Sequence, residues 1–165
     1  MEFLLTEIER ALDAGLYYIA LQSALTLPDI CGALMSSDGE ARKQNYIQWY
    51  DTYAKESGRW VISGEECYRF RCSCLHQLRT HHPKSEYSKI IFLHPDNNIL
   101  RTHNCILFGA LNIDLVIFCQ NIISAVRKWE AKFKNDPLFQ ANYANMLRMY
   151  PKGYPPYVVG IPVIT

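Results

Sequence analysis

The chain has 165 residues, of which 49% are hydrophobic and 20% are charged, and its formal net charge at pH 7 is +1. This length suits one domain with its own core, and the balance of apolar and charged residues excludes a disordered chain. The near-neutral charge excludes a general electrostatic attraction to nucleic acid, so a nucleic-acid role requires a local basic surface.

Nothing in the sequence indicates a membrane protein. The longest uncharged run, Ala14 to Pro28, is shorter than the roughly 20 residues that span a bilayer. The acidic, amphipathic start "MEFLLTEIER" lacks the pattern of a signal peptide. We therefore expect a cytoplasmic protein without a membrane partner.

Two amphipathic helices are predicted in the first third of the chain. Apolar residues recur at helical spacing from Glu2 to Ser23, and Pro28 is expected to end or kink this helix. The stretch "SSDG" at 36–39 predicts a break, after which a second helix runs from about Glu40 to Ala54. Its aromatic residues recur at steps of three and four, and we expect them to pack in the core rather than to stack on bases.

A third helix is predicted to begin after Ser63 and to run to about Arg79. The letters "SGEE" have the capping-box spacing, in which the Ser63 hydroxyl accepts from the amide of Glu66 and the Glu66 carboxylate reaches back. The stretch "THHPKS" then ends the helix, because it brings a proline and polar residues.

A β-hairpin is predicted next, formed by "YSKIIFLH" (87–94) and "THNCILFG" (102–109) with a turn at 95–101. Asn112 is expected to cap a last long helix, with Asp114 in its first turn.

The chain ends in a segment rich in proline and glycine, from about residue 150 to residue 165, which we expect to be extended on the surface or on a neighbour. The predicted fold class is mainly α. We expect a single domain over residues 1–165, built as a helical bundle with a small β-hairpin inserted before the last long helix.

The six cysteines are interpreted as reduced, buried packing groups, since no secretory context is visible. Three of them, Cys67, Cys72 and Cys74, lie on the third helix with His76. Residues two apart on a helix point about 200° apart, so this set neither converges on a metal ion nor places a thiolate beside an imidazole. We predict no metal site and no cofactor.

Arg71 and His76 are the residues of this helix with the clearest chemistry. An arginine offers permanent donors to a phosphate, and a histidine titrates near neutral pH and can move a proton. Together they suit RNA cleavage without a metal ion. Five residues span about 140° around a helix and about 7.5 Å along it, so one copy does not close a site, whereas two copies across a two-fold axis can.

The stretch "RCSCLH" (71–76) has the form R-x4-H, and "LTLPDICGAL" and "YIQWYD" lie before it. With these words the chain resembles the HEPN (higher eukaryotes and prokaryotes nucleotide-binding) ribonucleases over roughly Leu12 to Leu78, and more weakly over "NIDLVIFCQNIISAVRKW". The resemblance implies an HEPN-like helical bundle that acts as a homodimeric, metal-independent endoribonuclease. Such proteins often belong to toxin–antitoxin or phage-defence systems, which adds an antitoxin protein to the expected partners.

The resemblance also implies roles for single residues. Arg71 would stabilise the phosphate, and His76 would be the general base or acid. An acidic residue on an earlier helix often supports such sites, and Asp29 and Asp51 are the candidates here.

Basic residues follow the motif, whereas acidic ones precede it. A surface formed by Arg69, Arg79, His81, His82 and Lys84 is expected to bind the RNA backbone.

Two departures from the family pattern concern activity and regulation. The residue after Arg71 is Cys72, where the family commonly has Asn, Asp or His, and Leu78 stands where some of these toxins carry a modified tyrosine. Cys72 and the near-neutral charge favour an alternative, an inactive HEPN-like module that binds RNA, a nucleotide or a protein. A second alternative is an unrelated interaction protein that binds through its aromatic face and its tail.

Overall fold

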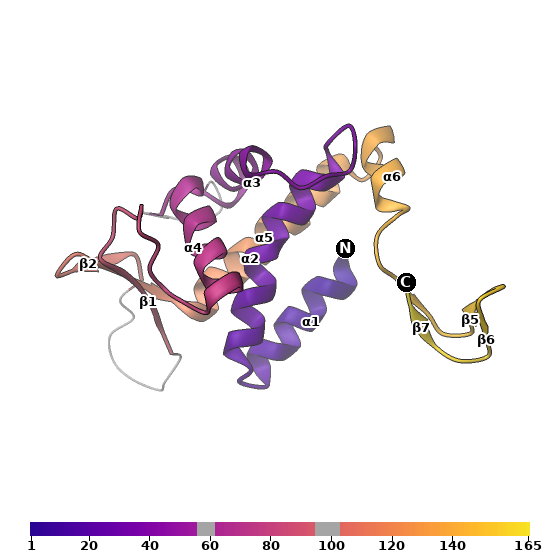
Figure 1. The fold of residues 1–165 in the computed structure, drawn as a ribbon, viewed down its shortest axis with the longest axis horizontal. Helices are drawn as coiled ribbons and strands as arrows, with labels where there is room; N and C mark the ends of the chain where they lie inside the picture. The colour runs from indigo at the N-terminus through magenta and orange to yellow at the C-terminus, as the bar shows by residue number, and fades with distance from the viewer. Residues whose placement is uncertain (56–61, 95–102) are drawn as a thin grey trace.

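The computed structural model describes residues 1–55, 62–94 and 103–165, and in these ranges the protein is mainly α-helical. Figure 1 shows the helices packed together, with a small sheet at one end and the C-terminal segment projecting at the other. The helices are α1 (Glu2–Asp13), α2 (Tyr17–Leu34), α3 (Lys43–Trp49), the π-helical turn η1 (Tyr50–Ala54), α4 (Gly64–Gln77), α5 (Leu115–Phe133) and α6 (Pro137–Tyr143). Within the described ranges, none of these helices combines the length and the apolar character that a bilayer crossing requires.

The first predicted helix is in fact two helices, α1 and α2. Gly15 has a φ of 72°, a left-handed conformation that favours glycine, and it turns the chain between them. Pro28, which was predicted to end or kink the helix, lies buried inside α2 and does not end it, because α2 continues to Leu34. Both halves of α2 bury apolar side chains against other helices, and this packing outweighs the hydrogen bond that proline cannot donate.

The central helix of the core is α2, which contacts α1, α3, α4, α5 and α6. The prediction that the aromatic face of the second helix packs in the core is confirmed, because Tyr46, Trp49 and Tyr50 are buried. The break expected at 36–39 separates α2 from α3. The largest fully buried aromatic side chains are Trp129, Tyr46, Tyr50, Phe70, Phe118 and Phe139.

The third predicted helix is α4, and its cap is partly confirmed. The Ser63 hydroxyl accepts a hydrogen bond from the Glu66 amide at 3.2 Å. The Glu66 carboxylate, however, is buried and contacts Arg69 and the hydroxyl of Ser85, which lies 2.6 Å away. The helix ends at Leu78, whose φ is 53°.

The pairing of the predicted hairpin was wrong. Strand β1 (Lys89–Leu93) pairs in parallel with β3 (Ala110–Asp114), and β2 (Cys105–Leu107) pairs with β3 antiparallel on its other side. The hairpin is therefore β2–β3, joined at Phe108 and Gly109 with φ values of 49° and 76°. The turn expected at 95–101 lies outside the described residues.

The cap of the last long helix was also misassigned. Asn112 lies in β3, where its side-chain amide donates to the carbonyls of Cys105 and Ala110, each at 3.2 Å. Asp114 caps α5 instead, because its Oδ1 accepts from the amide of Ile117 at 2.9 Å. The strand extends further than expected because the β2 and β1 partners satisfy its backbone groups.

After α6 the chain is extended, as expected for the tail. Two short antiparallel ladders brace it: β4 (Met149–Tyr150) with β7 (Val163–Ile164), and β5 (Gly153–Tyr154) with β6 (Val158–Val159). The segment thus leaves the helices and returns as an irregular hairpin, which we call the arm and define as residues 147–165. Figure 1 shows the arm projecting away from the helices.

Candidate functional site

Arg71 lies in the middle of α4 and reaches Asp29 on α2. Its Nε and Nη2 atoms both contact Oδ2 of Asp29, each at 2.8 Å. The side chains are 20% and 13% exposed, so the ion pair is largely but not fully removed from solvent. Nε and Nη2 form one edge of the guanidinium. The other edge, formed by Nη1 and Nη2, has no carboxylate partner among the described residues and remains available to a further anion.

Asp29 is the member of this pair that titrates. Burial raises the pKa of Asp29 above its ordinary range, and the charge and hydrogen bond of Arg71 offset this only in part. Burial also opposes the charge of Arg71. The charge of Asp29 and hydrogen bonds to Cys72 and Asp29 outweigh it, so the pKa of the guanidinium is raised. Arg71 therefore stays cationic throughout the physiological pH range.

Tyr68 and Cys72 complete the surroundings of Arg71. Cys72 follows Arg71 on α4, and burial, together with the nearby Cys72 side chain, raises the pKa of Tyr68. The sequence analysis did not single out Tyr68. A signal was present, because residues four apart, such as Tyr68 and Cys72, share one face of a helix.

His76 is in the last turn of α4, and its side chain is exposed. Arg71 faces α2, whereas His76 lies about 140° further around the helix and about 7.5 Å along it. One copy of the chain thus presents the two side chains on different parts of its surface. A closed site around a phosphate needs groups from elsewhere.

Of the two acidic candidates, the structure brings Asp29 to Arg71 and places Asp51 at the start of α4. The Oδ1 of Asp51 accepts a hydrogen bond from the backbone amide of Gly64 at 2.9 Å. Asp51 thereby satisfies an amide at the positive end of the helix and lies 4.0 Å from the ammonium of Lys55.

Arg69 does not share a surface with Arg71. Residues two apart are about 200° apart on a helix, and Arg69 turns to Glu65, at 3.1 Å, and to Glu66. The hydroxyl of Ser85 donates to the same Glu66 carboxylate. The chain after α4 therefore runs back along the helix on the Arg69 side.

The other four residues expected to bind RNA lie in this returning segment. Arg79, His81 and Lys84 are exposed, and His82 is half-buried with its Nδ1 accepting from the Lys84 amide at 3.1 Å. Arg79 and His81 follow the end of α4, so they are close in the chain to His76. An exposed arginine and a second exposed histidine thus lie close in the chain to His76.

All six cysteines are free thiols. Cys31, Cys67, Cys74 and Cys119 are buried, as expected of packing groups, whereas Cys72 and Cys105 are half-buried. Burial raises the pKa of Cys67 and of Cys119 to about 12, so both thiols stay protonated. Over residues 1–55, 62–94 and 103–165, no cluster of three or more His, Cys, Asp or Glu side chains is placed to hold a metal ion.

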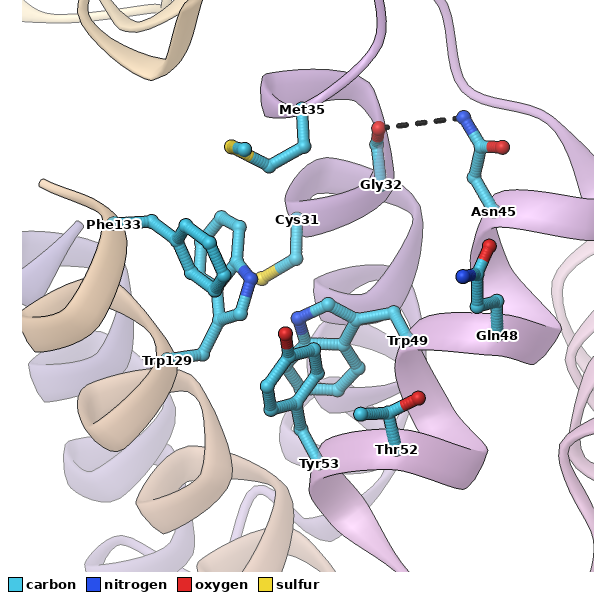
Figure 2. Close-up of a pocket in the computed structure, with 10 residues that line it drawn as sticks. All are labelled: Cys31, Gly32, Met35, Asn45, Gln48, Trp49, Thr52, Tyr53, Trp129 and Phe133. Atoms are coloured by element: carbon cyan, nitrogen blue, oxygen red, sulfur yellow. Dashed lines mark hydrogen bonds between the residues drawn. The ribbon is translucent and has the colours of Figure 1, made fainter. Parts of the chain in front are cut away.

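A separate cavity of about 300 Å³ lies between α2, α3 and α5. Four aromatic side chains wall it, as Figure 2 shows: Trp49, Tyr53, Trp129 and Phe133. Its lining has no charged side chain and does not include Arg71 or His76. The cavity suits an apolar or aromatic group, and it lacks the acid–base groups that surround α4.

Comparison with known proteins adds no relationship: no protein-family model, no curated protein and no solved structure matches this chain.

Proposed function

We propose that the protein is a metal-independent endoribonuclease of the HEPN type, active as a homodimer in a toxin or defence system. The observation that carries this proposal is the contact between Arg71 and Asp29. The arginine of the R-x4-H stretch is held by an acidic side chain of an earlier helix, and only one edge of its guanidinium is used. This arrangement supports the roles that the resemblance implies for Arg71 and Asp29.

In the proposed reaction, RNA supplies its own nucleophile. One His76 takes the proton of a ribose 2′-OH, whose oxygen attacks the adjacent phosphorus. The free edge of Arg71 donates hydrogen bonds to the oxygens of the pentacoordinate phosphorane as their negative charge grows. The P–O5′ bond breaks, and the His76 of the second copy protonates the leaving 5′ oxygen. The products are a 2′,3′-cyclic phosphate and a free 5′-OH.

A second copy is part of the proposal because Arg71 and His76 do not converge in one chain. The face formed by α2 and α4 around the ion pair is suited to such a contact, since its residues are half-buried rather than fully exposed. On α4 they are Tyr68, Arg71, Cys72 and Leu75, and on α2 they are Thr26 and Asp29. A two-fold axis at this face would bring two copies of "RCSCLH" together.

A non-catalytic module that binds RNA, a nucleotide or a protein is the second candidate. The observation that favours it is Cys72, a half-buried thiol next to Arg71 in the chain at the position where the family commonly has Asn, Asp or His. In this case Arg71 would still bind an anion, but His76 would not catalyse cleavage of the bound molecule.

Cleavage of total RNA in excess EDTA tests the proposal. We expect the wild-type protein to cut RNA and His76→Ala to lose about 100- to 10,000-fold in rate, the usual contribution of a general acid or base. Arg71→Lys keeps a positive charge but loses the planar fork, and we expect it to be strongly impaired as well. Gln77→Ala is the matched control, because Gln77 is the exposed neighbour of His76 in the same helical turn.

The outcomes separate the candidates. Equal RNA breakdown by the wild type and His76→Ala, or none by either, would refute the ribonuclease. RNA binding without cleavage, weakened by Arg71→Ala, would establish the non-catalytic module. Growth arrest on expression that depends on His76 would place the activity in a toxin or defence system.

A further inference from the structure

The arm exposes a large apolar surface. Its large apolar side chains are between 36% and 81% exposed, and they are Leu147, Met149, Tyr154, Tyr157, Val158, Val159, Ile161 and Ile164. At about 100 Å² each they expose roughly 800 Å² in total along the arm, which is similar to one partner's share of a standard interface. This surface indicates that the arm packs against another molecule.

The arm does not fold back on the helices from which it emerges. At its root, the guanidinium of Arg148 donates to the carbonyl of Tyr143 at 2.6 Å and lies 5.1 Å from the centre of the Tyr143 ring. Arg148 and Thr165 exchange two backbone hydrogen bonds, of 2.8 and 3.1 Å, which close the base of the hairpin. These contacts set the direction in which the arm projects (Figure 1). What covers its tip therefore comes from a second molecule.

An apolar groove of about 470 Å³ lies at the root of the arm, between α1, α2 and α6. Most of the side chains that line it are apolar: Phe3, Leu4, Ile30, Ala33, Leu34, Met146 and Leu147. Leu147 is the first residue of the arm and Met146 is the residue before it, so the groove and the arm are neighbours on the surface. Ile30 follows Asp29 on α2, so the groove also adjoins the contact with Arg71.

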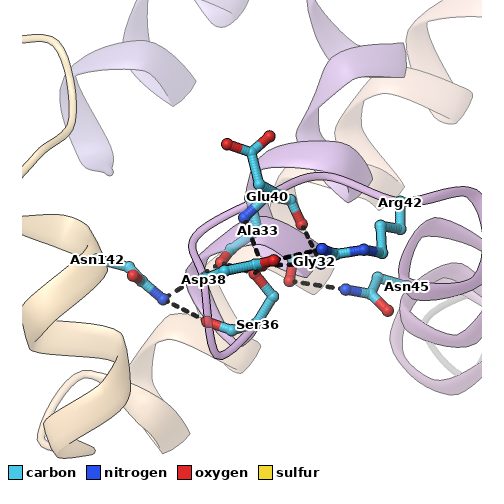
Figure 3. Close-up of polar contacts among 8 residues, drawn as sticks. All are labelled: Gly32, Ala33, Ser36, Asp38, Glu40, Arg42, Asn45 and Asn142. Atoms are coloured by element: carbon cyan, nitrogen blue, oxygen red, sulfur yellow. Dashed lines mark hydrogen bonds and ion pairs between the residues drawn. The ribbon is translucent and has the colours of Figure 1, made fainter.

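The rim of the groove is rigid before anything binds. The side-chain amide of Asn142 on α6 lies 3.3, 3.1 and 2.8 Å from the carbonyl oxygens of Ala33, Leu34 and Ser36. Figure 3 shows Asn142 with Ala33 and Ser36. The amide ties α6 to the end of α2. A preformed groove loses little conformational freedom when it is filled, which favours association.

Charge contributes less than apolar character to the match between the two surfaces. The arm carries Arg148 and Lys152 and no acidic side chain. Asp38, which lines the groove, is already paired with Arg42. Figure 3 shows the Glu40 carboxylate turned away from the rim contacts. The arm and the groove are therefore complementary mainly through their apolar side chains, and one chain carries both.

We propose that residues 147–165 are an exchange arm, which packs into the groove between α1, α2 and α6 of a second copy of this chain. Because the groove lies at the root of the arm, a two-fold axis next to the root sends each arm into the other copy's groove and closes the assembly at two copies. The proposal concerns how two copies associate. It is independent of the proposed function, because this two-fold axis lies at the root of the arm and not at the face of α2 and α4 where the ribonuclease would bring two copies of "RCSCLH" together.

Sedimentation equilibrium of the full chain tests the exchange arm. We expect a dimer for the wild type, and at least about tenfold weaker self-association for Val159→Asp on the arm and for Ala33→Trp in the groove. Ile106→Asp is the matched control, since Ile106 is 52% exposed on β2 and lies outside both surfaces, and it should leave the dimer unchanged. Circular dichroism checks that each variant is folded.

A mixture of Val159→Cys chains with Ala33→Cys chains provides a second readout. We expect a disulfide-linked heterodimer under mild oxidation, and no such product when either partner is replaced by the wild type.

A wild-type monomer, or a dimer that neither Val159→Asp nor Ala33→Trp weakens, would overturn the proposal. These results are read separately from RNA cleavage. Failure of the arm proposal leaves cleavage that depends on His76 in place, and failure of the ribonuclease leaves a dimer that depends on the arm.

Discussion

The contact between Arg71 and Asp29 should be measurable as a coupling free energy. The pair has two contacts of 2.8 Å, and its side chains are 20% and 13% exposed. Fully exposed pairs couple by about 0.2–1 kcal/mol, and breaking a fully buried pair costs about 3–5 kcal/mol. We therefore expect a coupling of about 1–3 kcal/mol in a double-mutant cycle of Asp29→Ala and Arg71→Ala, followed by urea unfolding.

The chain provides its own comparison for this cycle. Arg127 on α5 pairs with Glu9 on α1 at 2.7 Å, and these side chains are 40% and 39% exposed. Their coupling should stay below about 1 kcal/mol, because solvent screens the exposed charges. Additive effects of the Asp29 and Arg71 substitutions, or a coupling no larger than that of Glu9 and Arg127, would refute the idea that Asp29 holds Arg71.

The raised pKa of Asp29 predicts opposite pH dependences of stability and activity. The folded protein binds the carboxyl proton of Asp29 more tightly than the unfolded chain does. Protonation of Asp29 therefore favours the folded state as the pH falls through the raised pKa. At neutral pH, where Asp29 is ionised, the same group lowers the free energy of unfolding. Activity should fall over the same range, because a neutral Asp29 holds the Arg71 guanidinium less firmly. Because protonation of the His76 that acts as the base also lowers the rate, the acid side of the rate profile should contain two contributions, and Asp29→Asn should remove only that of Asp29. An acid side of the same shape in Asp29→Asn and in the wild type would refute a role for the charge of Asp29.

Three further substitutions test the fold around the site by thermal or urea unfolding. Gly32→Ala should destabilise by about 1–3 kcal/mol, because the added Cβ would lie 2.8 Å from the Cβ of Asn45 in the close contact of α2 and α3. Ser63→Ala should cost about 1 kcal/mol by removing the cap of α4, and an unchanged stability would show that the cap is dispensable. Asn142→Ala removes the amide that joins α6 to the end of α2 and should cost about 1 kcal/mol, because the carbonyls of Ala33 and Ser36 keep other donors, whereas Asn145→Ala, an exposed neighbour, should be nearly neutral.

Local signals in the sequence predicted α4 well. The Ser63 cap lies next to the residues that it stabilises, and the proline and polar residues after Leu78 mark the end of the helix. Gly15 and Pro28 led to wrong predictions because their effect depends on residues that are distant in the chain. An isolated glycine in an apolar pattern gave no sign of the turn between α1 and α2, and a proline was tolerated because tertiary packing supports both halves of α2.

The sheet was mispredicted because strand pairing is not local. The turn at Phe108 and Gly109 places a phenylalanine in the left-handed region, where asparagine or glycine is the usual signal. Asn112 and Asp114 are both frequent caps, so the sequence did not distinguish a strand that ends at Asp114 from a helix that begins at Asn112.

The candidate site shows the same limit. The spacing of Arg71 and His76 was visible in the sequence, but the choice between Asp29 and Asp51 was not, because Asp29 lies 42 positions before its partner. The extended tail was predicted, whereas its projection from the helices and the groove at its root depend on how α1, α2 and α6 pack.

Strand β3 also implies an order of folding. It pairs with β2 through a two-residue turn and runs directly into α5, so these segments form a compact unit with short loops to close. β1 joins the same strand from further away in the chain, since Lys89 pairs with Ala110. Phe92 of β1 also contacts Phe70 of α4, with ring centres 5.0 Å apart. We expect β3 to gain protection from amide exchange before β1 during refolding.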